Sequence, residues 1–219
     1  SKNNLLAENI QDNSILVTGN TVIDALLESV ERVNQVPSEL INKLSQTIGD
    51  KEMILVTGHR RENHGDGFIR ICEALKVIAL DNSERLILYP VHLNPKVQEP
   101  VKRILGDLPN VMLVDPLAYP DFIWMMNRAI IIITDSGGVQ EEAPSLGKPV
   151  LVMRDTTERP EAVEAGTVIL VGTNKDLIVS EALGLLNNPL HLEQMSRLHN
   201  PYGDGKACER IVHFIDKLV

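Results

Sequence analysis

Residues 129–134 read AIIIIT and lead directly into DSGGVQEE at residues 135–142. A short β-branched run followed by a polar turn and a helical pattern is typical of one strand–helix unit in a parallel sheet. Similar apolar runs occur on both sides of it. The runs that we expect to form strands are 52–57, 85–91, 111–114, 129–134, 149–153 and 168–171. Strands that alternate with helices in this way favour an α/β fold with a parallel sheet.

Apolar residues at helical spacing occur in the connections between the expected strands and in the stretches before the first strand and after the last. Such helical stretches lie in residues 22–33, 68–78, 97–105, 139–146, 177–198 and 206–218. Each connection between strands is long enough for a right-handed crossover, which places helices on both faces of the sheet. The pattern therefore predicts a Rossmann-like parallel sheet. Residues 15–18 (ILVT) look like an additional strand that has no partner upstream.

The overall composition disfavours several classes of protein. The 219 residues carry 21 basic and 30 acidic side chains, and the net charge of −9 has the wrong sign for binding nucleic acid through its phosphates. The longest apolar run, residues 129–133, is far shorter than the roughly 18 residues that cross a bilayer. We see no secretory signal and expect a cytoplasmic protein without a membrane partner. Cys72 lies on the apolar face of an expected helix, so we expect a buried free thiol rather than a disulfide or a metal ligand.

Polar loops follow four of the expected strands. They are GHRRENHGDG (58–67), HLNP (92–95), DSGGVQEE (135–142) and RDTTERPE (154–161). In an open parallel sheet, ligands bind outside the carboxyl ends of the strands, where these loops meet. We expect no metal there, because His59 and His64 have no third ligand at a metal-binding spacing.

The DSGG segment has the parts of an anion site. Ser136 can cap the following helix, and Gly137 and Gly138 let main-chain N–H groups approach a phosphate. Glu142, one helical turn further on, can reach back toward the two hydroxyls of a ribose. These features together indicate a nucleoside diphosphate. The alternative is a capped helix whose acidic residues are favoured by the helix dipole.

Two charged loops could complete such a site. His59 could transfer protons, and the neighbouring Arg60 could meet a phosphate. Arg154 or Arg159 could neutralise a departing diphosphate. The alternatives are a salt-linked surface turn for the first loop and an exposed charged loop for the second.

The chain resembles the C-terminal half of the non-hydrolysing bacterial UDP-N-acetylglucosamine 2-epimerases. The resemblance rests on VTGNTVIDALL, TGHRREN, PVHLNP, DSGGVQEEAPSLGKPVLVMRDTTERPEAVEAGT and HNPYGDG, in this order. It implies the second domain of a GT-B fold, which carries the nucleotide. It also implies that Ser136, Gly137 and Gly138 hold the diphosphate, Glu142 the ribose and Phe122 the uracil, that Arg159 completes the nucleotide site, and that His59 serves catalysis at the sugar.

The reaction implied by this resemblance inverts C2 of UDP-N-acetylglucosamine to give UDP-N-acetylmannosamine, a precursor of bacterial surface polysaccharides. It proceeds by elimination of UDP and its re-addition, without a cofactor. The resemblance further implies a homodimer and a second, activating UDP-N-acetylglucosamine near Arg60 and His92. Leu117 stands where close relatives have glutamine, so one contact near the uracil differs.

The resemblance also predicts how the chain is divided. Residues 1–20 are expected to be a remnant of an N-terminal Rossmann-like domain, 21–205 the UDP-binding domain, and 206–219 a helix that packs back on the first domain. The chain alone is then expected to bind UDP weakly and to catalyse no epimerisation. The alternatives are the nucleotide-sugar domain of a GT-B glycosyltransferase and a non-catalytic nucleotide-binding module.

Overall fold

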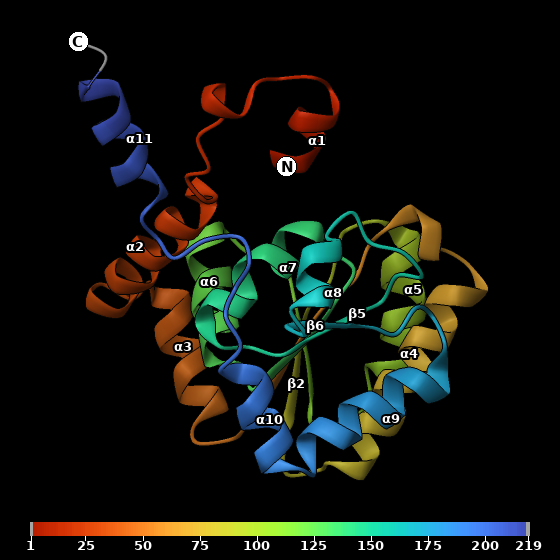
Figure 1. Ribbon diagram of the computed structural model, residues 1–219. Helices are drawn as coiled ribbons and strands as arrows, with labels where there is room; N and C mark the ends of the chain where they lie inside the picture. The colour runs from red at the N-terminus through yellow and green to blue at the C-terminus, as the bar shows by residue number, and fades with distance from the viewer. Residues whose placement is uncertain (1, 218–219) are drawn as a thin grey trace.

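A six-stranded parallel sheet forms the centre of the molecule (Figure 1). The computed structural model describes residues 2–217. The strands are β1 (Met53–Thr57), β2 (Leu86–Pro90), β3 (Val111–Val114), β4 (Ile131–Thr134), β5 (Val150–Val152) and β6 (Val168–Leu170). All six expected strands are confirmed. Their order, β3-β2-β1-β4-β5-β6, is that of a Rossmann fold.

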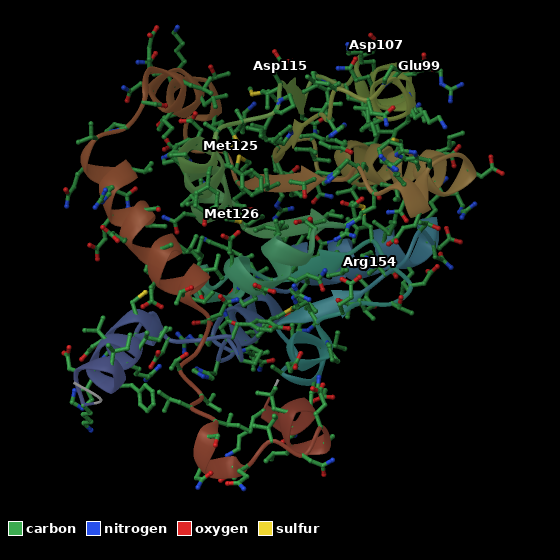
Figure 2. The ribbon with its side chains drawn as sticks, turned by 90° about the horizontal axis from the view of Figure 1, so that it is seen from above. Glu99, Asp107, Asp115, Met125, Met126 and Arg154 are labelled. Carbon is green, nitrogen blue, oxygen red and sulfur yellow. The ribbon has the colours of Figure 1, made fainter. Side chains whose placement is uncertain are left out.

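Helices cover both faces of the sheet, as predicted. One face packs against α4 (Asp66–Asp81), α5 (Pro95–Leu105) and α9 (Lys175–Leu186), which lie on the right in Figure 1. The other face packs against α2 (Thr21–Gln35), α3 (Glu39–Ile48), α6 (Tyr119–Arg128) and α7 (Gly137–Glu142). A short helix, α8 (Pro160–Glu164), lies between β5 and β6. In Figure 2, Met125 and Met126 of α6 point toward the interior, where both are buried. Each face of the sheet therefore has its own apolar core.

Three sequence expectations need correction. Residues 15–18 form no strand: they run between η1 (Asp12–Ser14) and α2, away from any strand that could supply a hydrogen-bonding edge. Residues 177–198 are not one helical run, because α9 ends at Leu186 and α10 spans Pro189–Ser196. Asn188 caps α10 by accepting the backbone N–H of His191 at 3.1 Å, and Pro189 favours a helix start. Helices α3 and α6 were not expected.

The two chain ends project from the main body on the same side (Figure 1). They consist of α1 (Lys2–Ala7) with η1, and of α11 (Ala207–Asp216). The helix expected over 206–218 is confirmed to Asp216, and Leu218 and Val219 lie outside the described residues. Exposed apolar side chains on these ends are Leu5, Leu6, Ile10, Leu16, Val17, Val212, Phe214 and Ile215.

The thiol prediction is confirmed. Cys72 is buried and free, and burial raises the pKa of its thiol to about 12. Cys208 is also free but exposed. Among residues 2–217, no helix is long and apolar enough to cross a membrane.

Candidate functional site

The site lies where the strand order changes direction, between β1 and β4. From this pair the chain continues outward to opposite edges of the sheet, which leaves a crevice at the carboxyl ends of the two strands. The ends are joined by a 2.6 Å hydrogen bond between the hydroxyls of Thr57 and Thr134. Thr134 also accepts the backbone N–H of Ser136 at 3.0 Å. The GHRREN and DSGG loops therefore begin at two neighbouring strand ends that are joined by a hydrogen bond.

Asp135 fastens these two loops together. Its side chain is fully buried, and Oδ2 accepts the backbone N–H groups of His59 and Arg60, both at 2.8 Å. The amide of Asn63 donates to the carbonyl of Met153 at 3.0 Å, which ties the same loop to the end of β5. The position of the GHRREN loop is thus set by buried polar contacts with two neighbouring strands.

His59 and His92 lie together at this rim. Their imidazole rings stack, with centroids 5.2 Å apart and planes at 7°. The Nδ1 atom of His92 accepts the backbone N–H of Asn94 at 3.1 Å. The His59 side chain is 47% exposed, so one face of the ring is open to a ligand. The structure thus brings together the histidines expected at the catalytic and at the activator sites.

Two arginines flank the start of α7. A Cβ on Gly137 would lie 3.8 Å from Nη2 of Arg60 and 4.0 Å from Nη2 of Arg159. Arg159 also pairs with Glu141 through its Nε. The glycine therefore opens a space between two cations and a helix N-terminus, a combination that suits a phosphate. The sequence suggested that Arg60 could meet a phosphate, whereas the family resemblance assigned it to a second ligand; its position beside Gly137 agrees with the first interpretation.

The expected cap at this helix is wrong in one respect. Ser136 occupies the N-cap position, but its hydroxyl makes no capping hydrogen bond. Gly138, the next residue along the helix after Gly137, is exposed. The first turn of α7 therefore presents backbone N–H groups that the Ser136 side chain does not satisfy.

Glu142 faces helix α6. Its carboxylate accepts a hydrogen bond from the hydroxyl of Tyr119, and Phe122 follows Tyr119 by one helical turn. Burial raises the pKa of Glu142, although the Tyr119 hydrogen bond opposes this. Burial and the bond to Glu142 raise the pKa of Tyr119 as well. Tyr119 was missed from the sequence, because the helix that carries it was not expected.

Arg154 has a structural role and is not free for a diphosphate. The side chain is buried, and Figure 2 shows it inside the fold. It donates to Glu62 at 2.7 Å and to both oxygens of Glu158 at 3.0 and 3.1 Å. The hydrogen bonds to Glu158 are the main reason why its pKa is raised. Glu62 of the GHRREN loop thus forms a salt bridge, as the alternative interpretation of that loop expected. Of the two arginines considered for the diphosphate, Arg159 is the one that lies near the start of α7.

Leu117 contributes to packing. It is partly buried and packs against the apolar core on the α6 face of the sheet, which also contacts Phe122. A leucine here therefore supports the position of α6.

Comparison with known proteins decides the family. The sequence model of the family described as UDP-N-acetylglucosamine 2-epimerase matches residues 1–216. The chain belongs to this family. The UDP-N-acetylglucosamine 2-epimerase of Escherichia coli K12 is 60% identical over 215 residues, which are 97% of this chain and 57% of that protein. The chain thus spans little more than half the length of this curated relative.

Solved structures of UDP-N-acetylglucosamine 2-epimerases agree with the fold. The Neisseria meningitidis enzyme bound to UDP-GlcNAc has a TM-score of 0.88 and 44% identity, covering 99% of this chain and 59% of that one. The UDP co-structure of S. aureus MnaA has a TM-score of 0.90 and 42% identity, covering 99% of this chain and 58% of that one. The sheet therefore corresponds to part of a larger epimerase fold of the GT-B type.

Proposed function

We propose that this chain is the UDP-binding part of an enzyme that inverts C2 of UDP-N-acetylglucosamine to give UDP-N-acetylmannosamine for surface polysaccharide synthesis. The observation that carries the proposal is the space at Gly137, flanked by the guanidinium groups of Arg60 and Arg159. Two similar structures, one bound to UDP-GlcNAc and one to UDP, support this choice of nucleotide.

In this proposal the diphosphate lies at the start of α7. The backbone of Ser136, Gly137 and Gly138 donates to its oxygens, and Arg159 supplies positive charge. The ribose hydroxyls donate to Glu142, whose carboxylate is already held by Tyr119 on α6. Phe122, on the same helix, then lies at the uracil.

The proposed chemistry needs a firm hold on UDP. UDP leaves from C1 of the sugar together with the proton on C2, and the resulting 2-acetamidoglucal takes both back with the opposite configuration at C2. The arginine charges and helix N–H groups stabilise the departing diphosphate, which lowers the barrier to breaking the bond at C1. His59, which is half-exposed at the same rim, acts as a catalytic residue at the sugar.

A second molecule of the same nucleotide sugar is proposed to contact Arg60 and His92. The stacking of His92 on His59 supports a contact between the two ligands. Because Arg60 also lies beside Gly137, this arginine would contact both diphosphates.

The chain ends are proposed to belong structurally to a further domain. Exposed apolar residues on 2–17 and on α11 support this division at residues 1–20, 21–205 and 206–219.

A homodimer is proposed from the family resemblance. A cytoplasmic location is proposed and agrees with two free thiols at Cys72 and Cys208, since reducing compartments keep thiols free.

The test is a reaction with one substrate. The protein in which this chain follows the N-terminal part present in its relatives is incubated with UDP-N-acetylglucosamine alone, and proton NMR follows the C2 epimer. We expect the manno isomer to accumulate, and we expect no turnover by residues 1–219 alone. Sugar transfer that requires an added acceptor would instead indicate a glycosyltransferase, and UDP binding without any turnover a binding module.

A further inference from the structure

Asp135 has one satisfied and one unsatisfied oxygen. Oδ2 accepts the backbone N–H groups of His59 and Arg60, whereas the buried Oδ1 has no hydrogen-bond partner among residues 2–217. Most buried polar atoms in proteins have a partner, so an unsatisfied carboxylate oxygen calls for an explanation. Anchoring the loop accounts for Oδ2 alone.

A candidate partner of Oδ1 is the imidazole of His59. Its Nδ1 lies 3.7 Å from Oδ1, which is too long for a hydrogen bond but within reach of a small ring movement. The His59 ring stacks on that of His92 with planes at 7°, so a small shift of the ring within its own plane would keep this stacking. Hydrogen bonds at catalytic groups are often long in the free protein and shorten when the substrate binds.

We propose that Asp135 is a positioning residue that holds His59 with its proton on Nδ1 and turns the unprotonated Nε2 toward the sugar. This rests on the proposed function, in which His59 acts at the sugar. The reason is chemical: an ionised carboxylate only accepts hydrogen bonds, so the ring nitrogen that faces it must carry the hydrogen. A carboxylate in this place also stabilises the imidazolium that forms when Nε2 takes up a proton.

His92 provides an internal reference. Its Nδ1 accepts the backbone N–H of Asn94, so its own proton must lie on Nε2. The two stacked imidazoles are therefore expected to hold opposite tautomers, and only that of His59 depends on Asp135.

Nitrogen-resolved NMR of the ¹⁵N-histidine-labelled chain at neutral pH tests the proposal. In the unmodified chain we expect the ¹⁵N shifts of a protonated Nδ1 for His59 and of a protonated Nε2 for His92. In Asp135→Asn, the amide oxygen can still accept the two loop N–H groups, while its NH₂ donates to Nδ1. The proton of His59 then moves to Nε2, and His92 does not change.

Two results would overturn the proposal. One is a protonated Nε2 on His59 in the unmodified chain, a measurement that needs no variant. The other is an unchanged His59 tautomer in Asp135→Asn while the backbone N–H signals of His59 and Arg60 keep their positions. UDP titration of the same samples separates this proposal from the proposed function: the predicted tautomers without UDP binding would support the first and contradict the second.

Discussion

The side chains of Arg60 and Arg159 and the start of α7 surround a small space beside Gly137. The Nη2 atoms of Arg60 and Arg159 lie 3.8 and 4.0 Å from the position of a Cβ there, so a methyl group would fit without a clash. The glycine is therefore not required by packing in the free protein. We infer that it is required by the ligand.

The Gly137→Ala variant distinguishes a role of Gly137 in packing from a role in ligand binding. We expect the variant to keep its melting temperature but to bind UDP at least about tenfold more weakly, or about 1.4 kcal/mol, because the methyl group occupies the space of a phosphate oxygen. Calorimetric titration with UDP measures this. The matched control is Gly184→Ala in α9, where a Cβ meets no atom within 4 Å. It should raise stability by about 0.5–1 kcal/mol and leave UDP affinity unchanged. Equal UDP affinities of the two variants would contradict the role of Gly137.

If Glu142 contacts UDP as proposed, UDP binding should depend on pH. Burial raises its pKa above the usual glutamate value, so on acidification its carboxylate is protonated at a higher pH than an exposed one. In the proposed site the charged form accepts the ribose hydroxyls, and affinity should therefore fall as the pH falls through this raised pKa. Glu142→Gln cannot titrate and should bind about tenfold more weakly near pH 7, a loss of about 1.4 kcal/mol.

Titration of both proteins with UDP across the acidic range isolates this effect, because the phosphates of UDP titrate equally in each experiment. The affinity of the unmodified chain should approach that of Glu142→Gln as the pH falls. Parallel curves would show that Glu142 does not contact the ligand.

At the scale of elements, α11 is attached to the body mainly at its first turn. Asp24 on α2 accepts the backbone N–H groups of Ala207 and Cys208 at 3.1 and 2.9 Å, so a side chain from another helix caps α11. Burial raises the pKa of Asp24, but these N–H groups, that of Cys208 first, more than offset this, and the pKa lies below its usual value. The cap is therefore present at neutral pH and weakens as the pH falls through the acidic range.

Asp24→Ala should loosen α11 selectively. Loss of a cap costs about 1 kcal/mol, so amide exchange in the first turn of α11 should become roughly fivefold faster. Hydrogen exchange with mass spectrometry measures this at neutral pH. Glu28→Ala is the control, because Glu28 is an exposed residue of the same helix that pairs with Arg32. Strong protection along the whole of α11 in the unmodified chain would contradict the proposal that its outer face packs on a further domain.

The elements that could be predicted from the sequence are those with an unambiguous apolar period. All six strands are predominantly apolar runs and were found, with ends that differ by at most two residues. Helix α6 was missed because YPDFIWMMNR is short and mixes its apolar residues over most of its circumference. Residues 15–18 have a strand-like composition, yet a strand needs a neighbour, and the sheet offers them none.

The site could be predicted only in part, because contacts between distant segments cannot be deduced from local sequence patterns. Motifs located His59, Gly137 and Glu142 because each follows a strand end. The partner that holds each of them depends on how distant loops meet: Asp135 anchors the His59 loop, Arg60 lies beside Gly137, and Tyr119 holds Glu142. The spacing of residues within one loop cannot predict these contacts, because each contact joins two different loops or helices.

At the scale of the whole molecule, the parallel topology brings positive groups together at one place in a protein of net charge −9. The reversal of strand order at β1 and β4 brings Arg60 to the start of α7, which lies more than 70 residues further along the chain. Arg159 joins them from the loop after β5. Two guanidinium groups and a helix N-terminus thus meet at one point of an acidic chain.

In the proposed function, residues 1–219 carry the nucleotide site by themselves. Isothermal titration of the folded chain with UDP tests it most directly. We predict saturable binding of one UDP per chain, weakened at least about tenfold, or about 1.4 kcal/mol, by Arg159→Ala. A flat titration with a chain shown to be folded by circular dichroism would contradict the account.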